Sequence, residues 1–276
     1  MIRLPPVWFV GCGHMAGALI AGWQKADVDF AEALAIRPSG RPVPGIRTLT
    51  TLPEKAPAPA RCVLGFKPQA LATVAPALSP RLSSETVLVS MLAGVEARTL
   101  RSLFPNVAAV VRIMPNLAVG EREGVTALFS DDASAQLRER MTLLFGLLGE
   151  AVWAESESGL GAIGALAAAG PAYVARFVAA LAAAGRERGL DGKLADRLAL
   201  ATVRGTALMA SRSEESMDEV ARRVASPNGT TEAGLAVLDN GGALDRLVAE
   251  TIAAAARRGE QLAAEARGVD SPSSLP

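Results

Sequence analysis

Histidine, cysteine and aromatic residues are scarce in this sequence. Its 276 residues include one histidine, His14, and two cysteines, Cys12 and Cys62, and aromatic residues make up 4% of the chain. A single histidine excludes a metal site with several histidine ligands and a Ser-His-Asp triad, so we expect no bound metal. Two cysteines outside any C-x-x-C pair exclude a disulfide framework and fit a reducing cytoplasm.

The chain also lacks net charge. Lys and Arg number 28, as do Asp and Glu, so no excess of one sign attracts nucleic acid or an anionic membrane surface. Residues 1–6 lead directly into an apolar strand, without the pattern of a signal peptide. We therefore expect a cytoplasmic protein whose partners are neither nucleic acid nor membrane.

One long apolar segment, 158–185, has Arg176 as its only charged residue. Its length is sufficient to cross a bilayer. However, Pro171 lies near its centre and many of its residues are the weakly apolar Ala and Gly, which disfavours membrane insertion. A helix that is apolar all round is otherwise buried in a large core or a subunit interface, and we expect an interface.

Short apolar runs alternate with helical patterns in the first half of the chain, as in a parallel sheet covered by helices. After about residue 158 only helical patterns follow. We predict an α/β Rossmann-type domain over 1–157 and an all-α domain over 158–276, with residues 37–59 as a loop containing one short strand. The predicted strands are Val7–Val10, Ala33–Ile36, Arg61–Phe66, Thr86–Ser90 and Ala108–Ile113, with weaker ones at Val125–Phe129 and Ala151–Trp153; the predicted helices are Met15–Gln24, Ser134–Leu148, 170–189, 193–212, 214–225, 231–239 and 243–267, and the tail 268–276 is expected to be disordered.

A glycine-rich loop follows the first predicted strand and opens a helix: Gly11-Cys12-Gly13-His14-Met15-Ala16. In dinucleotide-binding folds the first glycine makes the tight turn, the second lets the backbone approach the pyrophosphate, and a small third residue lets the helix pack on the strand. The context favours a dinucleotide site over a turn that binds nothing. We expect His14 to contribute its backbone N–H rather than its ring.

The end of the second strand indicates which dinucleotide binds. An NAD site usually has an acidic residue there for the ribose hydroxyls, whereas this chain has Arg37 and Ser39 and no acid nearby. Arginine grips phosphate through charge-assisted hydrogen bonds. We predict NADPH in preference to NADH, the alternative being a solvated loop arginine.

Three further strand ends meet at the same edge of the predicted sheet, where open α/β sheets bind ligands. Lys67 and Pro68 follow one strand, and Lys67 either reaches the cofactor or is simply exposed. The segments Leu92-Ala93-Gly94 and Met114-Pro115-Asn116 end the next two strands. The small residues Ala93 and Gly94 allow close approach to a nicotinamide, and Asn116 offers the cofactor a polar contact.

A loop at Ser226–Thr231 interrupts the Ala- and Leu-rich second half. Pro227, Asn228 and Gly229 mark a turn, and Thr230 and Thr231 stand at the predicted start of the next helix. The free N–H groups of a helix N-terminus can bind an anion. Thr231 is either a helix cap or a functional hydroxyl.

With these motifs in view, the chain resembles the pyrroline-5-carboxylate reductases from about Val7 to Leu262. This family reduces a cyclic imino acid to proline, the last step of proline biosynthesis. The resemblance implies a Rossmann domain followed by a helical domain through which subunits dimerise, and larger rings of dimers occur in the family. It rests on Gly11–Met15, Lys67-Pro68-Gln69, Ala93-Gly94-Val95, Arg112–Asn116, Gly170-Pro171-Ala172-Tyr173 and Ser226–Thr231.

The resemblance also implies roles for the loop at Ser226–Thr231. Backbone N–H groups of Gly229, Thr230 and Thr231 would hold the substrate carboxylate, and the Thr231 hydroxyl would lie near the ring nitrogen. The chain departs from the family at Ala167–Ala169, where the usual Ser-Gly-Ser is absent. Thr231 is therefore the expected catalytic hydroxyl.

Two alternatives to this function stay open. One is an NADPH-dependent reductase of another cyclic imine, and the other is a non-catalytic NADP-binding homologue, because a fold alone does not imply turnover. Hydroxyacid enzymes of similar architecture use a lysine on the long interdomain helix, and residues 159–188 contain none.

Overall fold

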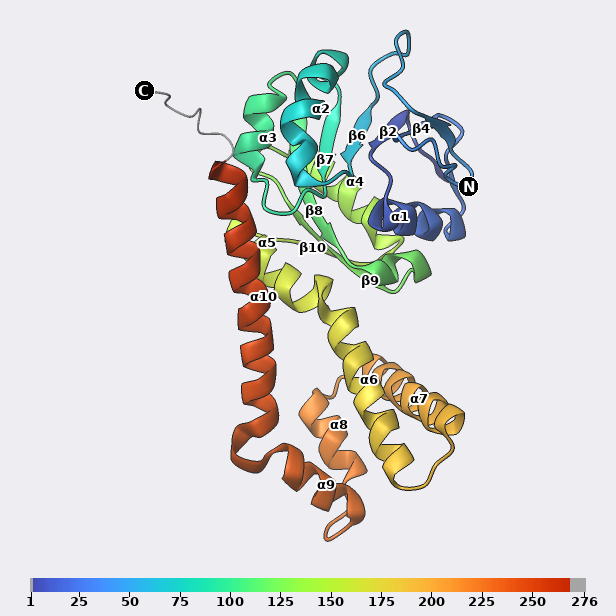
Figure 1. The fold of residues 1–276 in the computed structure, drawn as a ribbon, viewed down its shortest axis with the longest axis vertical. Coiled ribbons are helices and arrows are strands. Elements are labelled where there is room, and N and C mark those ends of the chain that lie inside the picture. The colour runs from blue at the N-terminus through green and yellow to red at the C-terminus, as the bar shows by residue number, and fades with distance from the viewer. Residues whose placement is uncertain (1, 269–276) are drawn as a thin grey trace. The chain divides into compact units, whose positions relative to one another are not determined.

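The computed structural model describes residues 2–268, which form two compact units. Of the described residues, one unit comprises 2–169 together with 255–268, and the other comprises Gly170–Ala254. Figure 1 shows the ribbon of both. The division differs from the predicted one at 157/158, because the helical segment after Glu157 packs on the sheet of the first unit.

The first unit is built around an eight-stranded sheet with the order β10-β9-β8-β7-β6-β2-β4-β5. Successive strands are placed outward on either side of β2, so the direction of winding reverses between β2 and β6, where ligands of such sheets bind. A separate parallel pair, β1 with β3, was not predicted. The strands are β1 (Ile2–Arg3), β2 (Val7–Val10), β3 (Val28–Asp29), β4 (Ala33–Ile36), β5 (Arg47–Leu49), β6 (Arg61–Leu64), β7 (Val87–Ser90), β8 (Ala109–Pro115), β9 (Gly124–Phe129) and β10 (Gly149–Trp153).

The prediction of a parallel sheet is wrong at one pair. Strand β9 runs antiparallel to β8, and β10 runs parallel to β9. The eight residues between β8 and β9 contain only the short 3₁₀ helix η3 (Leu117–Glu121) and a left-handed Arg122 with φ of 64°. A parallel crossover needs about a dozen residues or more, so this short connection turns the chain back on itself.

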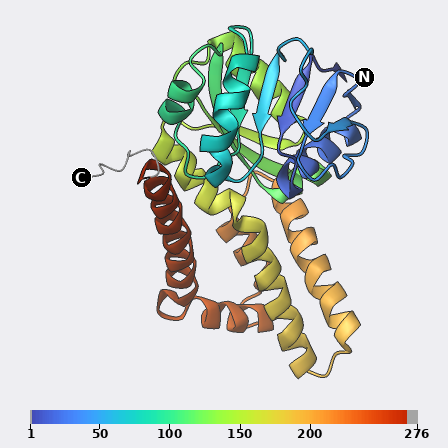
Figure 2. The ribbon, with the colours of Figure 1, turned by 45° about the horizontal axis from the view of Figure 1, so that its top comes forward.

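Helices cover both faces of the sheet, as Figures 1 and 2 show. Helices α1 (His14–Lys25) and α4 (Ala135–Gly146) pack on one face, where Trp23 and Phe145 join the core around Phe9. Helices α2 (Leu71–Leu78), α3 (Ala97–Leu103) and α5 (Glu157–Ile163) pack on the other face, around Trp8. Because both faces are buried, every residue of β2 is buried and apolar.

The segment after α5 continues as a π-helix, η4 (Gly164–Ala168), against β8 and β9. A Cβ on Gly164 would lie 1.8 Å from Sδ of Met114 on β8, so the helix reaches the sheet this closely only because it has glycine there. Short 3₁₀ helices occupy Pro68–Ala70 (η1), Ser79–Arg81 (η2) and Asn240–Gly242 (η5).

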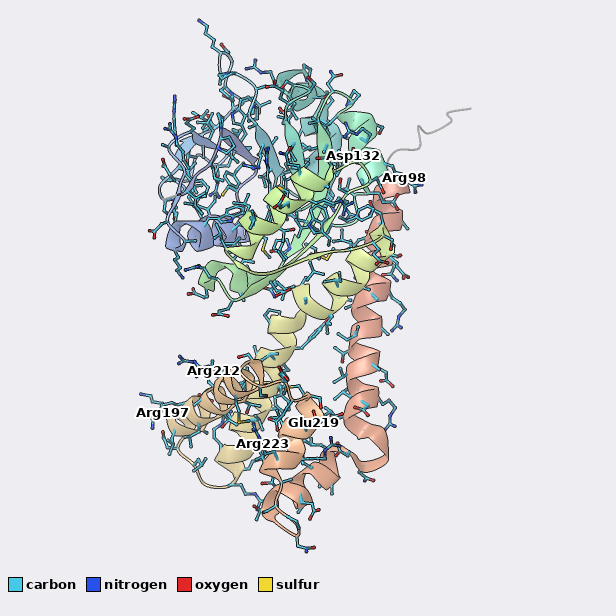
Figure 3. All side chains as sticks on the ribbon, turned by 180° about the vertical axis from the view of Figure 1, so that it is seen from behind. Arg98, Asp132, Arg197, Arg212, Glu219 and Arg223 are labelled. Carbon is cyan, nitrogen blue, oxygen red and sulfur yellow. The ribbon has the colours of Figure 1, made fainter. Side chains whose placement is uncertain are left out.

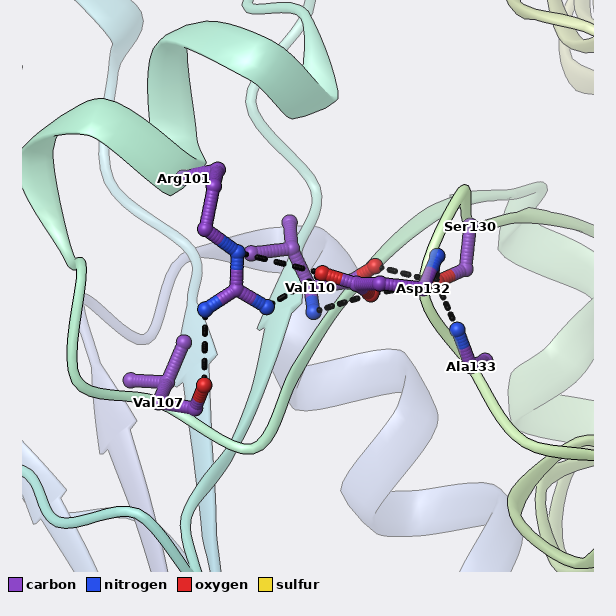
Figure 4. A network of polar contacts seen from close by, with 6 residues as sticks. All are labelled: Arg101, Val107, Val110, Ser130, Asp132 and Ala133. Atoms are coloured by element: carbon purple, nitrogen blue, oxygen red, sulfur yellow. Dashed lines mark hydrogen bonds and ion pairs between the residues drawn. The ribbon is translucent and has the colours of Figure 1, made fainter.

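A polar network fixes the start of β8 (Figure 4). The Asp132 carboxylate accepts hydrogen bonds from the Val110 N–H and the Ser130 hydroxyl, each at 3.0 Å, and from Nε of Arg101 at 3.1 Å. Arg101 also donates to the carbonyl of Val107 at 2.7 Å. The network joins α3, β8 and the end of β9 at the edge of the sheet opposite to the carboxyl end of β8.

The second unit is helical, as predicted, with α6 (Gly170–Glu187), α7 (Gly192–Ser211), α8 (Met217–Val224), α9 (Thr230–Leu238) and the first part of α10 (Ala243–Gly268). Glu219 and Arg223 lie on α8 (Figure 3). The hydroxyl and the N–H of Ser216 both donate to Glu219, which lowers the pKa of its carboxyl, and this capping box fixes the start of α8. Of the predicted disordered tail, residues 269–276 lie outside the described residues.

Helix α6 has two apolar faces. Val178 and Ala182 pack against Ala195 and Ala199 of α7, while Val174, Phe177 and Leu181 on another face are exposed. The continuous helix Glu157–Glu187 is long and apolar enough to cross a membrane by length and composition, because it contains an 18-residue window with a mean hydropathy of 1.5. Its exposed apolar face therefore needs either a protein partner or a lipid environment.

Candidate functional site

A cavity of about 690 Å³ lies in the first unit at the carboxyl ends of β2, β4, β6, β7 and β8. This is the switch point of the sheet, and the volume is typical of a site for a cofactor or small molecule. Its walls are Gly11, Cys12, Gly13, His14, Met15, Ala16, Arg37, Pro38, Ser39, Gly65, Phe66, Lys67, Met91, Leu92, Ala93, Arg112, Ile113, Met114, Pro115 and Ala168.

The glycine-rich loop forms one wall and has the features of a phosphate cradle. Gly11 has φ of +78°, and a Cβ there would lie 2.6 Å from the backbone nitrogen of Phe66. A Cβ on Gly13 would meet nothing within 4 Å, so its open side offers space for a ligand. Gly13 is the N-cap of α1, no side chain caps this helix, and its first turn has no acid. Its N–H groups are suited to a pyrophosphate.

Cys12 and His14 lie in the same loop. Burial raises the pKa of the Cys12 thiol, and the positive charge of Arg37 opposes this shift. The thiol is therefore protonated at neutral pH, which excludes a thiolate nucleophile. His14 is the first residue of α1, in agreement with a contribution through its backbone. Within residues 2–268, no group of three or more His, Cys, Asp or Glu residues is arranged to hold a metal ion.

Arg37 and Ser39 form a basic corner after β4. Nε of Arg37 donates to Oγ of Ser39 at 3.1 Å, and Gly40 N–H donates to the Arg37 carbonyl at 3.0 Å, closing a turn. Within the described residues, the two terminal nitrogens of Arg37 have no hydrogen-bond partner. This corner has the donors that a 2′-phosphate needs.

Lys67, Pro68 and Ala93 differ in their position. Lys67 and Ala93 line the cavity, whereas Pro68 begins η1 and is not part of the wall. Gly94, which we expected to allow close approach to a nicotinamide, approaches α10 instead. A Cβ on Gly94 would lie 2.7 Å from the carbonyl carbon of Leu262.

Asn116 does not line the cavity. It is 5% exposed, and its amide donates to the Ala167 carbonyl at 3.0 Å and accepts from Ala118 N–H and Val125 N–H at 3.2 and 3.3 Å. These bonds tie β8, η3, β9 and η4 together. These hydrogen bonds give Asn116 a structural role, because a buried amide must have hydrogen-bond partners, and its contact with the cofactor stays a prediction.

The loop at Ser226–Thr231 lies in the second unit. Asn228 has φ of 56°, its N–H donates to Glu232 at 2.6 Å, and Gly229 N–H donates to the Ser226 carbonyl at 2.9 Å. Gly229, not Thr231, is the N-cap of α9, and no side chain caps this helix. The cap interpretation of Thr231 is therefore wrong, and its exposed hydroxyl forms no hydrogen bond in the part of the chain described.

Sequence reasoning did not assign a role to Arg112 or Glu157. Arg112 is only 7% exposed, lines the cavity and forms an ion pair with Glu157. The signal was a charged residue inside an otherwise apolar predicted strand, which requires a buried partner.

The comparisons with known proteins agree along most of the chain. A family model described as pyrroline-5-carboxylate reductase dimerisation matches residues 157–262. A pyrroline-5-carboxylate reductase of Pseudomonas aeruginosa is 35% identical over 266 residues, covering 94% of this chain and 97% of the relative. One of Pisum sativum is 32% identical, with 91% and 94% coverage.

Solved structures of proteins with this name are also similar. A pyrroline-5-carboxylate reductase from Coxiella burnetii has a TM-score of 0.83 and 28% identity, covering 94% of this chain and 98% of that one. A Plasmodium falciparum pyrroline carboxylate reductase with NADP bound has a TM-score of 0.84 at 24% identity, covering 95% of this chain and all of that one, a likeness of fold.

Proposed function

Because the chain belongs to the pyrroline-5-carboxylate reductase family, we propose that it reduces 1-pyrroline-5-carboxylate to L-proline with NADPH, and less well with NADH. The observation that carries the proposal is the cavity at the switch point of the sheet, with its glycine cradle at one wall and the Arg37–Ser39 corner beside it.

The residues of the cavity fit this cofactor. The open side of Gly13 and the uncapped start of α1 suit the pyrophosphate, and Arg37 with Ser39 suits the 2′-phosphate. The small side chain of Ala93 leaves space in the half formed by β7 and β8, to which we assign the nicotinamide. When bound, the reduced nicotinamide supplies the hydride for the imine carbon.

The loop at Gly229–Thr231 is proposed to hold the substrate. The uncapped N–H groups at the start of α9 would bind the carboxylate, and the free hydroxyl of Thr231 would donate to the ring nitrogen. A hydroxyl is a weak acid, so it orients and polarises the imine while the proton comes from solvent. Reduction of the C=N bond consumes one hydride and one proton and yields the secondary amine.

A homodimer through the helical unit is the proposed assembly, with rings of dimers as a further stage. The family model for dimerisation begins at residue 157 and so covers the exposed apolar face of α6. This favours a protein partner over lipid for that face. A cytoplasmic location is likewise proposed, since both cysteines are free thiols; a membrane-bound fraction after lysis would contradict it.

Loss of NADPH absorbance with pyrroline-5-carboxylate tests the activity. The six-membered imino acid and a reaction without substrate serve as comparisons. We expect the higher kcat/KM with the five-membered ring. Faster turnover of the six-membered ring would indicate a reductase of another cyclic imine, and tight NADPH binding without turnover of either would indicate a non-catalytic homologue.

A further inference from the structure

A charged side chain lies in the middle of the cavity wall. Arg112 is on β8, between two apolar neighbours, and its side chain is 8% exposed. A buried guanidinium without a counter-charge is strongly destabilising. Its one ion-pair partner is Glu157, and its Nε has no hydrogen-bond partner among the described residues. The position of Arg112 therefore depends on a single carboxylate.

Glu157 uses both carboxylate oxygens. One accepts from Nη1 of Arg112, and the other accepts from the backbone N–H of Ala97 at 2.7 Å. Ala97 is the first residue of α3, and Glu157 is the first residue of α5. The N–H of Ala97 has no partner inside its own helix. One side chain thus joins a strand and the starts of two helices.

These three elements carry one half of the cavity. Strand β8 contributes Arg112–Pro115, the loop before α3 contributes Met91–Ala93, and α5 leads through η4 to Ala168. In the sheet order, β7 and β8 lie on the other side of β2 and β6 from β4, and Arg37 and Ser39 follow β4 in the chain. Glu157 is therefore joined to the half assigned to the nicotinamide and not to the phosphate corner.

We propose that Glu157 is a positioning residue for the nicotinamide half of the cavity. It acts through Arg112 and Ala97 and touches neither cofactor nor substrate. The proposal rests on the proposed function, because it assumes that NADPH occupies this cavity. A glutamine at position 157 can accept a hydrogen bond from the Ala97 N–H but offers Arg112 no counter-charge. Glu157→Gln therefore removes the ion pair that positions Arg112 on β8 and keeps the hydrogen bond to the start of α3.

The test compares two ligands in the full chain with Glu157→Gln. One is NADPH, and the other is 2′-phospho-ADP-ribose, which has the phosphates but no nicotinamide. We expect the Kd of the second ligand to stay within about twofold, while kcat/KM with NADPH falls about ten- to hundredfold, as for misplaced reacting groups. Glu155→Gln is the matched control, because Glu155 is exposed and two residues away, and it should change neither quantity.

Glu157→Asp keeps the negative charge but has a shorter side chain. It should lower kcat/KM with NADPH by less than Glu157→Gln does, and it should leave the Kd of 2′-phospho-ADP-ribose unchanged. Equal weakening of both ligands, or a lower melting temperature with unchanged kcat/KM, would mean a purely structural ion pair and overturn the proposal. If the unmodified protein binds neither ligand, both the proposed function and the positioning role fail. If the unmodified protein binds both ligands and the Glu157→Gln variant gives the same Kd and kcat/KM values, only the positioning role fails.

Discussion

Thr231 is the residue for which the structure changed the interpretation most. As a helix cap it would contribute about 1 kcal/mol of stability, but Gly229 occupies the cap position of α9. Thr231→Ala should therefore leave the melting temperature nearly unchanged and lower kcat on the order of a hundredfold, as for loss of one positioned donor. Thr231→Ser retains the hydroxyl and should recover most of the rate. A Thr231→Ala enzyme with full turnover would remove Thr231 from the mechanism.

At the same scale, we predict that Arg37 sets the preference for NADPH over NADH. Among the described residues its two terminal nitrogens have no hydrogen-bond partner, so they are available to a phosphate. Hydrogen bonds to charged groups contribute about 1.5–3 kcal/mol, or roughly a 10- to 150-fold change in a binding constant. In Arg37→Asp, kcat/KM with NADPH should fall by that factor, while the value with NADH changes little or rises. Arg47→Asp makes the same charge change at an exposed residue of β5 outside the cavity and should not change the NADPH/NADH ratio. An unchanged ratio in Arg37→Asp would contradict the assignment.

The sequence predicted the residues whose backbone conformation shapes the site better than it predicted the contacts that side chains make. The glycine spacing predicted the loop because Gly11 has a positive φ and a close approach to Phe66 that suit glycine, and Gly13 leaves open space for a ligand. The structural role of Asn116 was not predicted, because its three hydrogen bonds are to Ala118 of η3, Val125 of β9 and Ala167 of η4. No local pattern encodes such long-range pairing.

At the scale of elements, the contact of α10 with the loop after β7 was also unpredictable from sequence. Gly94 adjoins the backbone of Leu262 and Ala263, far along the chain. The antiparallel turn from β8 to β9, by contrast, was readable in principle, because eight residues are too few for a crossover helix. The length of a connection limits the relative direction of the two strands that it joins, whereas the position of a distant helix depends on side-chain packing.

Gly94→Ala tests this docking. The residue has φ of +76°, and the new Cβ would lie 2.7 Å from the Leu262 carbonyl carbon. Backbone strain of this kind costs on the order of 1–3 kcal/mol, and displacement of α10 adds to it, so the melting temperature should fall by several degrees. The KM for NADPH should rise as well, because Ala93 lines the cavity.

Gly189→Ala separates strain from docking. Gly189 has φ of +90°, but a Cβ there would meet nothing within 4 Å. This variant should show the backbone strain alone, with a smaller loss of stability and an unchanged KM. If both variants lose equal stability, α10 does not press on Gly94 in solution.

At the scale of the whole molecule, the uncovered apolar face of α6 determines what the chain must do to be stable in water. Val178 and Ala182 of α6 pack against α7, whereas Val174, Phe177 and Leu181 are 50%, 45% and 39% exposed. These three recur at helical spacing on one side, so they form a stripe rather than scattered residues. A stripe of this kind within the region matched by the dimerisation model is best covered by a second copy of the chain.

Phe177→Asp should therefore break the assembly. A buried, unpaired carboxylate costs several kcal/mol in an interface, so size-exclusion chromatography with light scattering should show a shift from dimer or larger species toward monomer. Turnover should fall with it. Leu143→Asp is the matched control, since Leu143 is 67% exposed on α4 and lies outside residues 157–262. A Phe177→Asp protein that keeps its assembly, or an unmodified protein that requires detergent to remain in solution, would mean that this face meets something other than a second copy.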